Sequence, residues 1–176
     1  NTDAILTNAS WVIGSSLISR NPDAFETYAR VFVTQGTAGL AGQDYPAAAV
    51  SYAEPGLLDL VQLETLDGSL AEVFADPRAI AVNVSDSEKY FGTESPLGRT
   101  LIIDLPHDVS LDYVVQAVYR LPQPSTLYYL HFLALLDPAV PPQPGLGTDI
   151  WVRSPVQQQD VEVRHYFKLR EGYDVL

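Results

Sequence analysis

ADPRAIAVNVSDSEKYFGTESPLGRTLIID, residues 75–104, is the stretch of this sequence that decides the fold class. Its apolar run Ala79–Val84 predicts a short buried strand, because the run is too brief for a core helix and is rich in β-branched residues. Ser85 and Glu88 have the spacing of a capping box, in which a hydroxyl and a carboxylate satisfy the first amides of a helix. We therefore expect a short helix that ends at Gly92, where the left-handed conformation is free of steric cost.

The residues that follow predict more strands, each reached through a turn. Ser95–Gly98 is rich in turn residues and leads into a strand over Thr100–Asp104. A turn at Pro106–Asp108 reverses the chain into a longer strand over Asp112–Leu121. The apolar run Thr126–Leu136 is typical of a buried central strand.

Towards the N-terminus the pattern is mixed. Apolar residues at three- and four-residue steps predict an amphipathic helix over Asp3–Arg20. Strands are expected at Phe25–Val33 and Ala47–Ala53, joined by a glycine-rich loop over Gly36–Gly42. Two short helical pieces then end near Leu60 and Phe74. We expect the following turns around them: Glu54–Gly56 and Leu66–Gly68.

At the C-terminal end, Asp137–Gly147 contains four prolines and two glycines and is expected to be an ordered loop or a protrusion. Strands are predicted at Ile150–Val152 and Val161–Leu169. In the second, His165 shares a face with valines and Phe167, and charged residues lie opposite. Many strands with few short helices predict an α+β fold with mixed or antiparallel sheets.

Composition excludes several classes of function. Ten basic and 22 acidic residues give a formal net charge of −12, which repels nucleic acid and anionic lipid surfaces. The chain has no cysteine, so disulfides, cysteine-ligated zinc and thiol catalysis are excluded. No apolar stretch is long enough to span a bilayer. A partner of this chain is therefore not expected to be a nucleic acid.

The candidate catalytic and metal-binding residues do not form a recognisable motif. P-loop, GxSxG, HExxH and GxGxxG patterns are absent. His107 is interpreted as a solvated turn residue, and His131 and His165 as satisfied histidines of apolar strands. The three lack metal-ligand spacing.

Two groups of carboxylates are candidate sites. Asp59, Glu64 and Asp67 straddle a turn, where carboxylates could act as general acid and base, but we interpret this segment as a solvated loop. Asp104 and Asp108 flank another turn and could bind calcium, but they lack the dense oxygen-ligand alternation of a calcium loop. The sequence therefore predicts no catalytic residue, no cofactor-binding residue and no metal ligand.

The central stretch resembles the periplasmic core domain of MacB/FtsX-type ABC transporter permeases. The resemblance is carried by Asp76-Pro77, by Tyr90-Phe91-Gly92, and by the turn Pro96-Leu97-Gly98-Arg99-Thr100 that opens a strand. The strand at Asp112–Leu121 is similar to the next strand of the family, with Ala117 where glycine is usual.

The resemblance extends in both directions. Tyr52–Leu63 is similar to an upstream segment of the family, although Leu57 and Leu58 stand where aromatic residues are usual. Tyr166–Gly172 resembles the end of such domains. The match thus covers most of Ala47–Gly172, and residues before it match by order of elements.

The resemblance implies one extracytoplasmic domain over residues 1–176 with two lobes, set between transmembrane helices on the periplasmic face of the bacterial inner membrane. It implies mechanotransmission: cytoplasmic ATP hydrolysis drives movement of the domain, which moves a periplasmic or membrane substrate without chemistry of its own. The implied partners are a second permease copy or paralogue, a cytoplasmic ABC ATPase, and a periplasmic adaptor or substrate. Loop Asp137–Gly147 and exposed tyrosines are candidate partner contacts.

Three alternatives stay open. One is a periplasmic module that binds a peptide, lipoprotein or small ligand without transport, which a sizeable apolar pocket would favour. Another is an enzyme with carboxylates brought together from distant positions, which clustered groups with perturbed pKa values would favour. The third is an adhesion or scaffold module.

Overall fold

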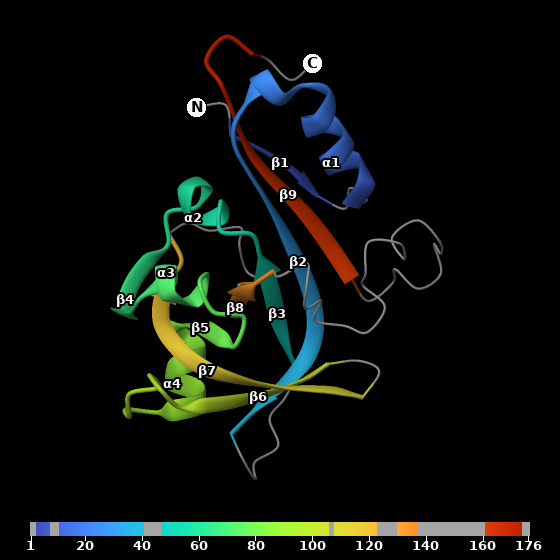
Figure 1. Ribbon diagram of the computed structural model, residues 1–176. Coiled ribbons are helices and arrows are strands. Elements are labelled where there is room, and N and C mark those ends of the chain that lie inside the picture. Colours follow the sequence, from blue (N-terminus) through green and yellow to red (C-terminus); the bar gives the residue numbers. More distant parts are fainter. Residues whose placement is uncertain are drawn as a thin grey trace.

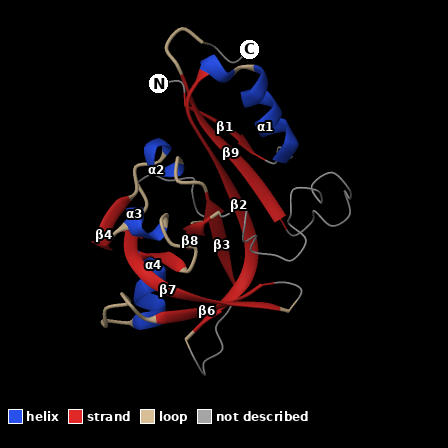
Figure 2. Ribbon diagram, viewed as in Figure 1, coloured by secondary structure: helices blue, strands red, loops and turns tan. Residues whose placement is uncertain are grey.

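The computed structural model describes residues 3–7, 11–40, 47–105, 108–122, 130–136 and 161–173, and strands dominate it (Figure 2). The fold is α+β, with one mixed sheet and short helices, as predicted. In chain order the elements are β1 (Asp3–Thr7), α1 (Trp11–Arg20), the 3-10 turn η1 (Pro22–Ala24), β2 (Phe25–Gly39), β3 (Ala47–Ala53), α2 (Leu57–Leu60), β4 (Glu64–Gly68), α3 (Leu70–Val73), β5 (Ala79–Asn83), α4 (Val84–Phe91), β6 (Thr100–Leu105), β7 (Val109–Arg120), β8 (Phe132–Leu135) and β9 (Val161–Leu169).

Six of the strands form a closed circuit, which we call the ring. Going round it, the neighbours are β2, β3, β8, β5, β7 and β6, and β6 pairs in turn with the C-terminal end of β2. The pairs β3–β8 and β5–β7 are parallel, and the other pairs of the circuit are antiparallel. Closure leaves these six strands without a free edge between them.

A second region, which we call the outer arm, extends from the ring. It comprises β1, α1, η1, the first part of β2 (residues 25–30) and the end of β9 (residues 165–169). β9 pairs with β2 on one side and with β1 on the other. Figure 1 shows the arm beside the labels N and C, with the ring at the other end of β2. The long strand β2 therefore belongs to both regions.

Three apolar clusters hold these elements together. The ring cluster draws on all six strands of the circuit and on α4, whose Tyr90 ring meets Phe132 edge-on at 5.5 Å. The helix-side cluster packs α2 and α3 against the sheet through buried residues such as Leu57 and Val73. The arm cluster is much smaller and has these buried members: Ala24, Phe25, Phe167 and Leu169.

The strand–helix–strand unit predicted over residues 79–104 is present as β5, α4 and β6. Gly92 ends α4 as expected, with a positive φ of 63° that favours glycine, but its ψ of −123° lies outside the left-handed helical region. The expected capping box is wrong. The N-cap is Asn83, whose side-chain oxygen accepts the Ser85 amide at 3.0 Å, so the helix begins earlier than Ser85 and Glu88 indicate.

Three other predictions were wrong because long-range strand pairing overrides local pattern. Residues 3–7 of the predicted helix Asp3–Arg20 form a strand that pairs with β9, and the helix begins at Trp11. The part of the expected loop up to Gly39 continues β2, because it pairs with β3 and then with β6. The expected turn Leu66–Gly68 is part of β4, which pairs with β7 through an irregular register.

The other strand predictions have mixed outcomes. Strand β9 is present at Val161–Leu169 with the predicted alternation, and on its second face Arg164 and Tyr166 are buried while Lys168 is exposed. Of the predicted strand Thr126–Leu136, residues 132–135 form β8, and residues 126–129 lie outside the described residues. The loop Asp137–Gly147 and the strand Ile150–Val152 also lie outside them.

None of the helices in the described ranges combines the length and the apolar composition needed to cross a bilayer. The division into two lobes and the extent of the domain over residues 1–176 stay predictions.

Candidate functional site

The two ends of the described chain meet at the outer arm. β1 and β9 pair antiparallel with Asp3 opposite Lys168, so the first and last described strands run side by side (Figure 1). Lys168 also forms an ion pair with Glu26 of β2 at 2.7 Å. The Arg170 amide donates to the Ala24 carbonyl at 2.9 Å, which ties the segment after β9 to the start of β2.

Between the outer arm and the ring, β2 is held by an ion pair with the segment after β3. β3 pairs with β2 only from Val31 onward, because Pro55 and Gly56 turn the chain away. Glu54 extends the pairing by one step: its amide donates to the Arg30 carbonyl at 3.0 Å, and its carboxylate accepts the Arg30 amide at 2.9 Å. The Glu54 carboxylate thus takes the place of a backbone carbonyl of β3.

The same carboxylate also binds the Arg30 guanidinium. Arg30 Nε donates to Glu54 Oε1 at 2.9 Å, and the terminal nitrogen Nη2 contacts the same oxygen. Both side chains are less than a quarter exposed, at 19% and 24%. A pair that is joined by several hydrogen bonds and is this little exposed contributes more to stability than a surface salt bridge, because water screens it less.

Along the edge of β2 that pairs with β9, the Tyr28 side chain contacts the buried His165 of β9. The Tyr28 hydroxyl lies 2.6 Å from His165 Nδ1, and the two rings stack with centroids 5.9 Å apart. Burial is the main cause that raises the pKa of Tyr28 well above its ordinary value of 10.0. The phenol therefore stays protonated and shares a hydrogen bond with Nδ1.

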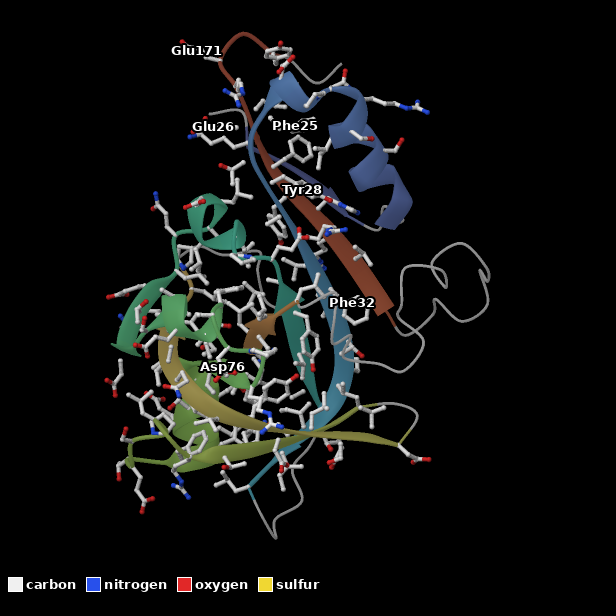
Figure 3. All side chains as sticks on the ribbon, viewed as in Figure 1. Phe25, Glu26, Tyr28, Phe32, Asp76 and Glu171 are labelled. Atoms are coloured by element: carbon white, nitrogen blue, oxygen red, sulfur yellow. The ribbon has the colours of Figure 1, made fainter. Side chains whose placement is uncertain are left out.

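Figure 3 shows Phe25, Tyr28 and Phe32 in sequence along β2, from the arm towards the ring. Tyr28 and Arg30 lie two residues apart and so share one face of the strand. We call the set Tyr28, Arg30, Glu54 and His165 the neck. Gly56 packs against it closely: a Cβ atom there would lie 2.6 Å from the Tyr28 carbonyl oxygen. Only glycine permits this approach of α2 to β2.

A second polar pair joins β8 to α4. His131 Nδ1 lies 2.8 Å from Asp86 Oδ2, with the histidine 44% and the aspartate 9% exposed. The hydrogen bond with Asp86 is the main cause that raises the pKa of His131 above 6.5. The Asn83 amide donates to the His131 carbonyl at 2.9 Å, so the pair also fixes the start of α4.

Two of the three histidines lie in the described residues, and each has a hydrogen-bond partner at Nδ1: Tyr28 for His165 and Asp86 for His131. His107 lies outside the described residues. The described part of the chain contains no group of three or more histidine and carboxylate side chains that would hold a metal ion.

The predicted carboxylate groups do not form a site in the described structure. Glu64 on β4 pairs with Arg120 at 2.9 Å, and the Asp67 carboxylate accepts the Gly68 amide at 3.0 Å. Asp59 lies in the short helix α2, and Asp104 is exposed on β6.

The candidate contact residues for a partner include Tyr173, which is 47% exposed.

The neck was missed at the sequence level. Tyr28 and His165 are separated by 137 positions, so no local pattern connects them. The sequence offered one signal for it. Tyr28 and Arg30 occupy alternate positions of a predicted strand, and a glutamate stands directly before Pro55. The neck joins β2, β9 and the segment after β3 through the Tyr28–His165 hydrogen bond and the Arg30–Glu54 ion pair.

Comparison with known proteins finds likeness in structure alone: no family model and no curated protein matches the sequence. The periplasmic region of MacB from Actinobacillus actinomycetemcomitans superimposes with a TM-score of 0.62 at 13% identity, covering 96% of this chain and 68% of that one. A domain of a protein predicted to be a permease, from Porphyromonas gingivalis, gives 0.63 at 20% identity, covering 90% and 62%.

The extracellular domain of the noncanonic ABC-type transporter YknZ from Gram-positive bacteria gives a TM-score of 0.59 at 14% identity, covering 93% of this chain and 74% of that one. The three agree with the resemblance found in the central stretch of the sequence. The chain has the fold of these periplasmic and extracellular transporter domains.

Proposed function

We propose that this chain is the extracytoplasmic domain of an ABC transporter permease and that it moves as a rigid body when a cytoplasmic ATPase hydrolyses ATP. The observation that carries the proposal is the likeness to the periplasmic region of MacB over 96% of the chain. The likeness to the extracellular domain of YknZ supports it, because the two transporters come from different kinds of bacteria.

The position of the chain ends supports the proposal. A domain set between two membrane helices needs its entry and exit on one side, and the pairing of Asp3 with Lys168 brings them together. The partners proposed are a second permease copy and a cytoplasmic ATPase, and the proposed location is the outer face of the bacterial inner membrane.

The continuity of β2 supports a mechanical role. Its 15 residues run from the arm, where the first and last described strands pair with each other, to the joint with β6 in the ring. A displacement at the arm is passed along a hydrogen-bonded ladder with β9 that covers Phe25 to Thr34. Rigid-body rotation of this kind is a recognised form of conformational switching.

Location is tested with one cysteine introduced into this chain, which has none, in a full-length protein from which any other cysteine has been removed. Thr93→Cys lies at an exposed position after α4. In spheroplasts that produce the full-length protein, we expect a membrane-impermeant maleimide to label it without lysis. Labelling that requires lysis would contradict the proposed location.

Movement is tested with the same protein in nanodiscs together with its ATPase. Spin labels at Thr93→Cys, one on each of the two permease copies, report the distance between their rings by pulsed electron–electron double resonance. We expect the distance to differ between the nucleotide-free and the vanadate-trapped ATP states. An unchanged distance in both states would contradict mechanotransmission.

A further inference from the structure

One face of the β2–β9 ladder carries a polar layer between two apolar clusters. On the arm side of the layer, Phe167 belongs to the arm cluster, with Tyr28 packed against it. On the ring side, Phe32 and Val163 belong to the ring cluster. The successive cross-strand pairs on this face are Tyr28–Phe167, Arg30–His165 and Phe32–Val163.

The opposite face of the same ladder packs differently. Ala29, Val31 and Tyr166 belong to the helix-side cluster, which continues under α2. On this face the buried Arg164 lies opposite Val31, and beyond Ala29–Tyr166 the next pair towards the arm is the polar pair Thr27–Lys168. The helix-side cluster and the arm cluster share no described residue, so the polar contacts of the neck help to oppose bending between the arm and the ring.

At this level β2 also loses a neighbour. β3 contributes ladder pairs only from Val31 towards the C-terminus of β2, so at Arg30 the described strand that flanks β2 is β9. Sheets of few strands twist and flex more than wide ones. The Glu54 side chain supplies the bond that a further residue of β3 would have made.

We propose that the neck is a lock: the Tyr28–His165 hydrogen bond and the Arg30–Glu54 ion pair fix the angle between the outer arm and the ring. The role of the lock in transport rests on the proposed function. There, the arm receives movement from the membrane side, and the lock makes the ring follow. Without it, the arm would bend about β2 and the ring would lag.

The angle is measured on the protein itself. Spin labels at Asp23→Cys in η1 and Thr93→Cys after α4 report the distance from arm to ring within one copy. We expect a narrow distance distribution for the otherwise unchanged protein. In the neck variant, Tyr28→Phe with Glu54→Gln, we expect a broader distribution.

The matched control removes bonds of the same two types elsewhere. Tyr119→Phe deletes a buried hydroxyl that donates to the Leu130 carbonyl at 2.8 Å, and Glu64→Gln deletes the carboxylate that pairs with Arg120. We expect the control to keep the original distribution width. A folded neck variant with the width of the control would overturn the lock.

Loss of folding is separated from loss of the lock by thermal unfolding and by the single variants. Tyr28→Phe and Glu54→Gln are each measured below their own unfolding temperatures, where circular dichroism shows native strand content. We expect each to broaden the distribution less than the pair does. Original widths in both single variants and in the pair would also overturn the lock.

The transport role is tested in nanodiscs with the ATPase, by distances between copies at Asp23 and, separately, at Thr93. In the neck variant we expect ATP-driven movement at Asp23 to persist and movement at Thr93 to shrink. Equal movement at both positions would overturn the lock's role in transmission. Absence of movement even without the neck substitutions would instead count against the proposed function.

Discussion

The ring and the outer arm share strand β2 but differ in how they are closed. The ring is a circuit of six strands with two large apolar clusters against it. Among the described residues of the arm, Ala29 and Tyr166 belong to the helix-side cluster, and the other buried apolar residues form the small cluster around Phe25 and Phe167, whose rings meet edge-on at 5.5 Å. We infer that the ring carries most of the stability and that the arm depends on its connection to the ring.

The largest effect is expected from emptying the ring cluster. Phe132 on β8 is fully buried, and Phe132→Ala should lower the free energy of unfolding by about 4 kcal/mol through lost burial and a cavity. Phe25→Ala in the arm should cost about 2 kcal/mol, because a site 9% exposed near the surface can close over the gap. Urea unfolding measures both, and equal costs would remove the contrast between the regions.

The joint that closes the ring can be opened at Gly36. A Cβ atom there would lie 2.6 Å from the Asp104 carbonyl oxygen of β6, a distance that forces the backbones of β2 and β6 apart. Gly36→Ala should lower the free energy of unfolding by about 2 kcal/mol. The exposed neighbour Thr37→Ala is the control. A loss no greater than that of the control would show that the joint tolerates separation.

The His131–Asp86 pair gives the ring a pH-dependent contact at α4. The pKa of His131 is raised in the folded protein, so the contribution of the protonated ring is fully present below its ordinary value of 6.5. It is lost as the pH rises through the folded-state pKa.

We therefore expect the free energy of unfolding to fall over that window, and His131→Gln to remove this part of the fall. Denaturant unfolding at a series of pH values measures it. An identical pH profile for the variant would mean that other groups cause the dependence.

The smallest effect is expected at the surface pair Glu64–Arg120, whose side chains are 61% and 50% exposed. Glu64→Gln should change the free energy of unfolding by less than about 0.5 kcal/mol, because water screens the pair. Glu54→Gln at the neck should cost more, on the order of 1–3 kcal/mol, since that carboxylate also accepts the Arg30 amide. Thermal or urea unfolding compares the two, and equal losses would argue against the neck.

Local signals were sufficient where a segment is stabilised by its own residues. The run Ala79–Val84, the stop at Gly92 and the turn before Thr100 each have a local physical cause, and the structure has β5, α4 and β6 there. The start of α4 was misplaced because two residues compete for the cap, and Asn83 rather than Ser85 provides it.

Segments stabilised by distant partners were not predictable in this way. Residues 3–7 have a helical pattern but pair with β9, more than 150 positions away. The glycines at 36 and 39 predict a loop, but both lie in β2. At Gly36 a glycine is required because the backbone of β6 approaches closely. The neck belongs to the same class, since Tyr28 meets His165 only after the sheet has formed.

The strand β4 has a consequence for how copies of the protein behave at high concentration. It ends the order of the sheet beyond β7, and all five of its residues are exposed. A second molecule adding a strand there would meet an irregular register between Thr65 and Asp67, and the carboxylates of Glu64 and Asp67 would face another acidic chain. Edge-to-edge aggregation through this strand is disfavoured by both shape and charge repulsion.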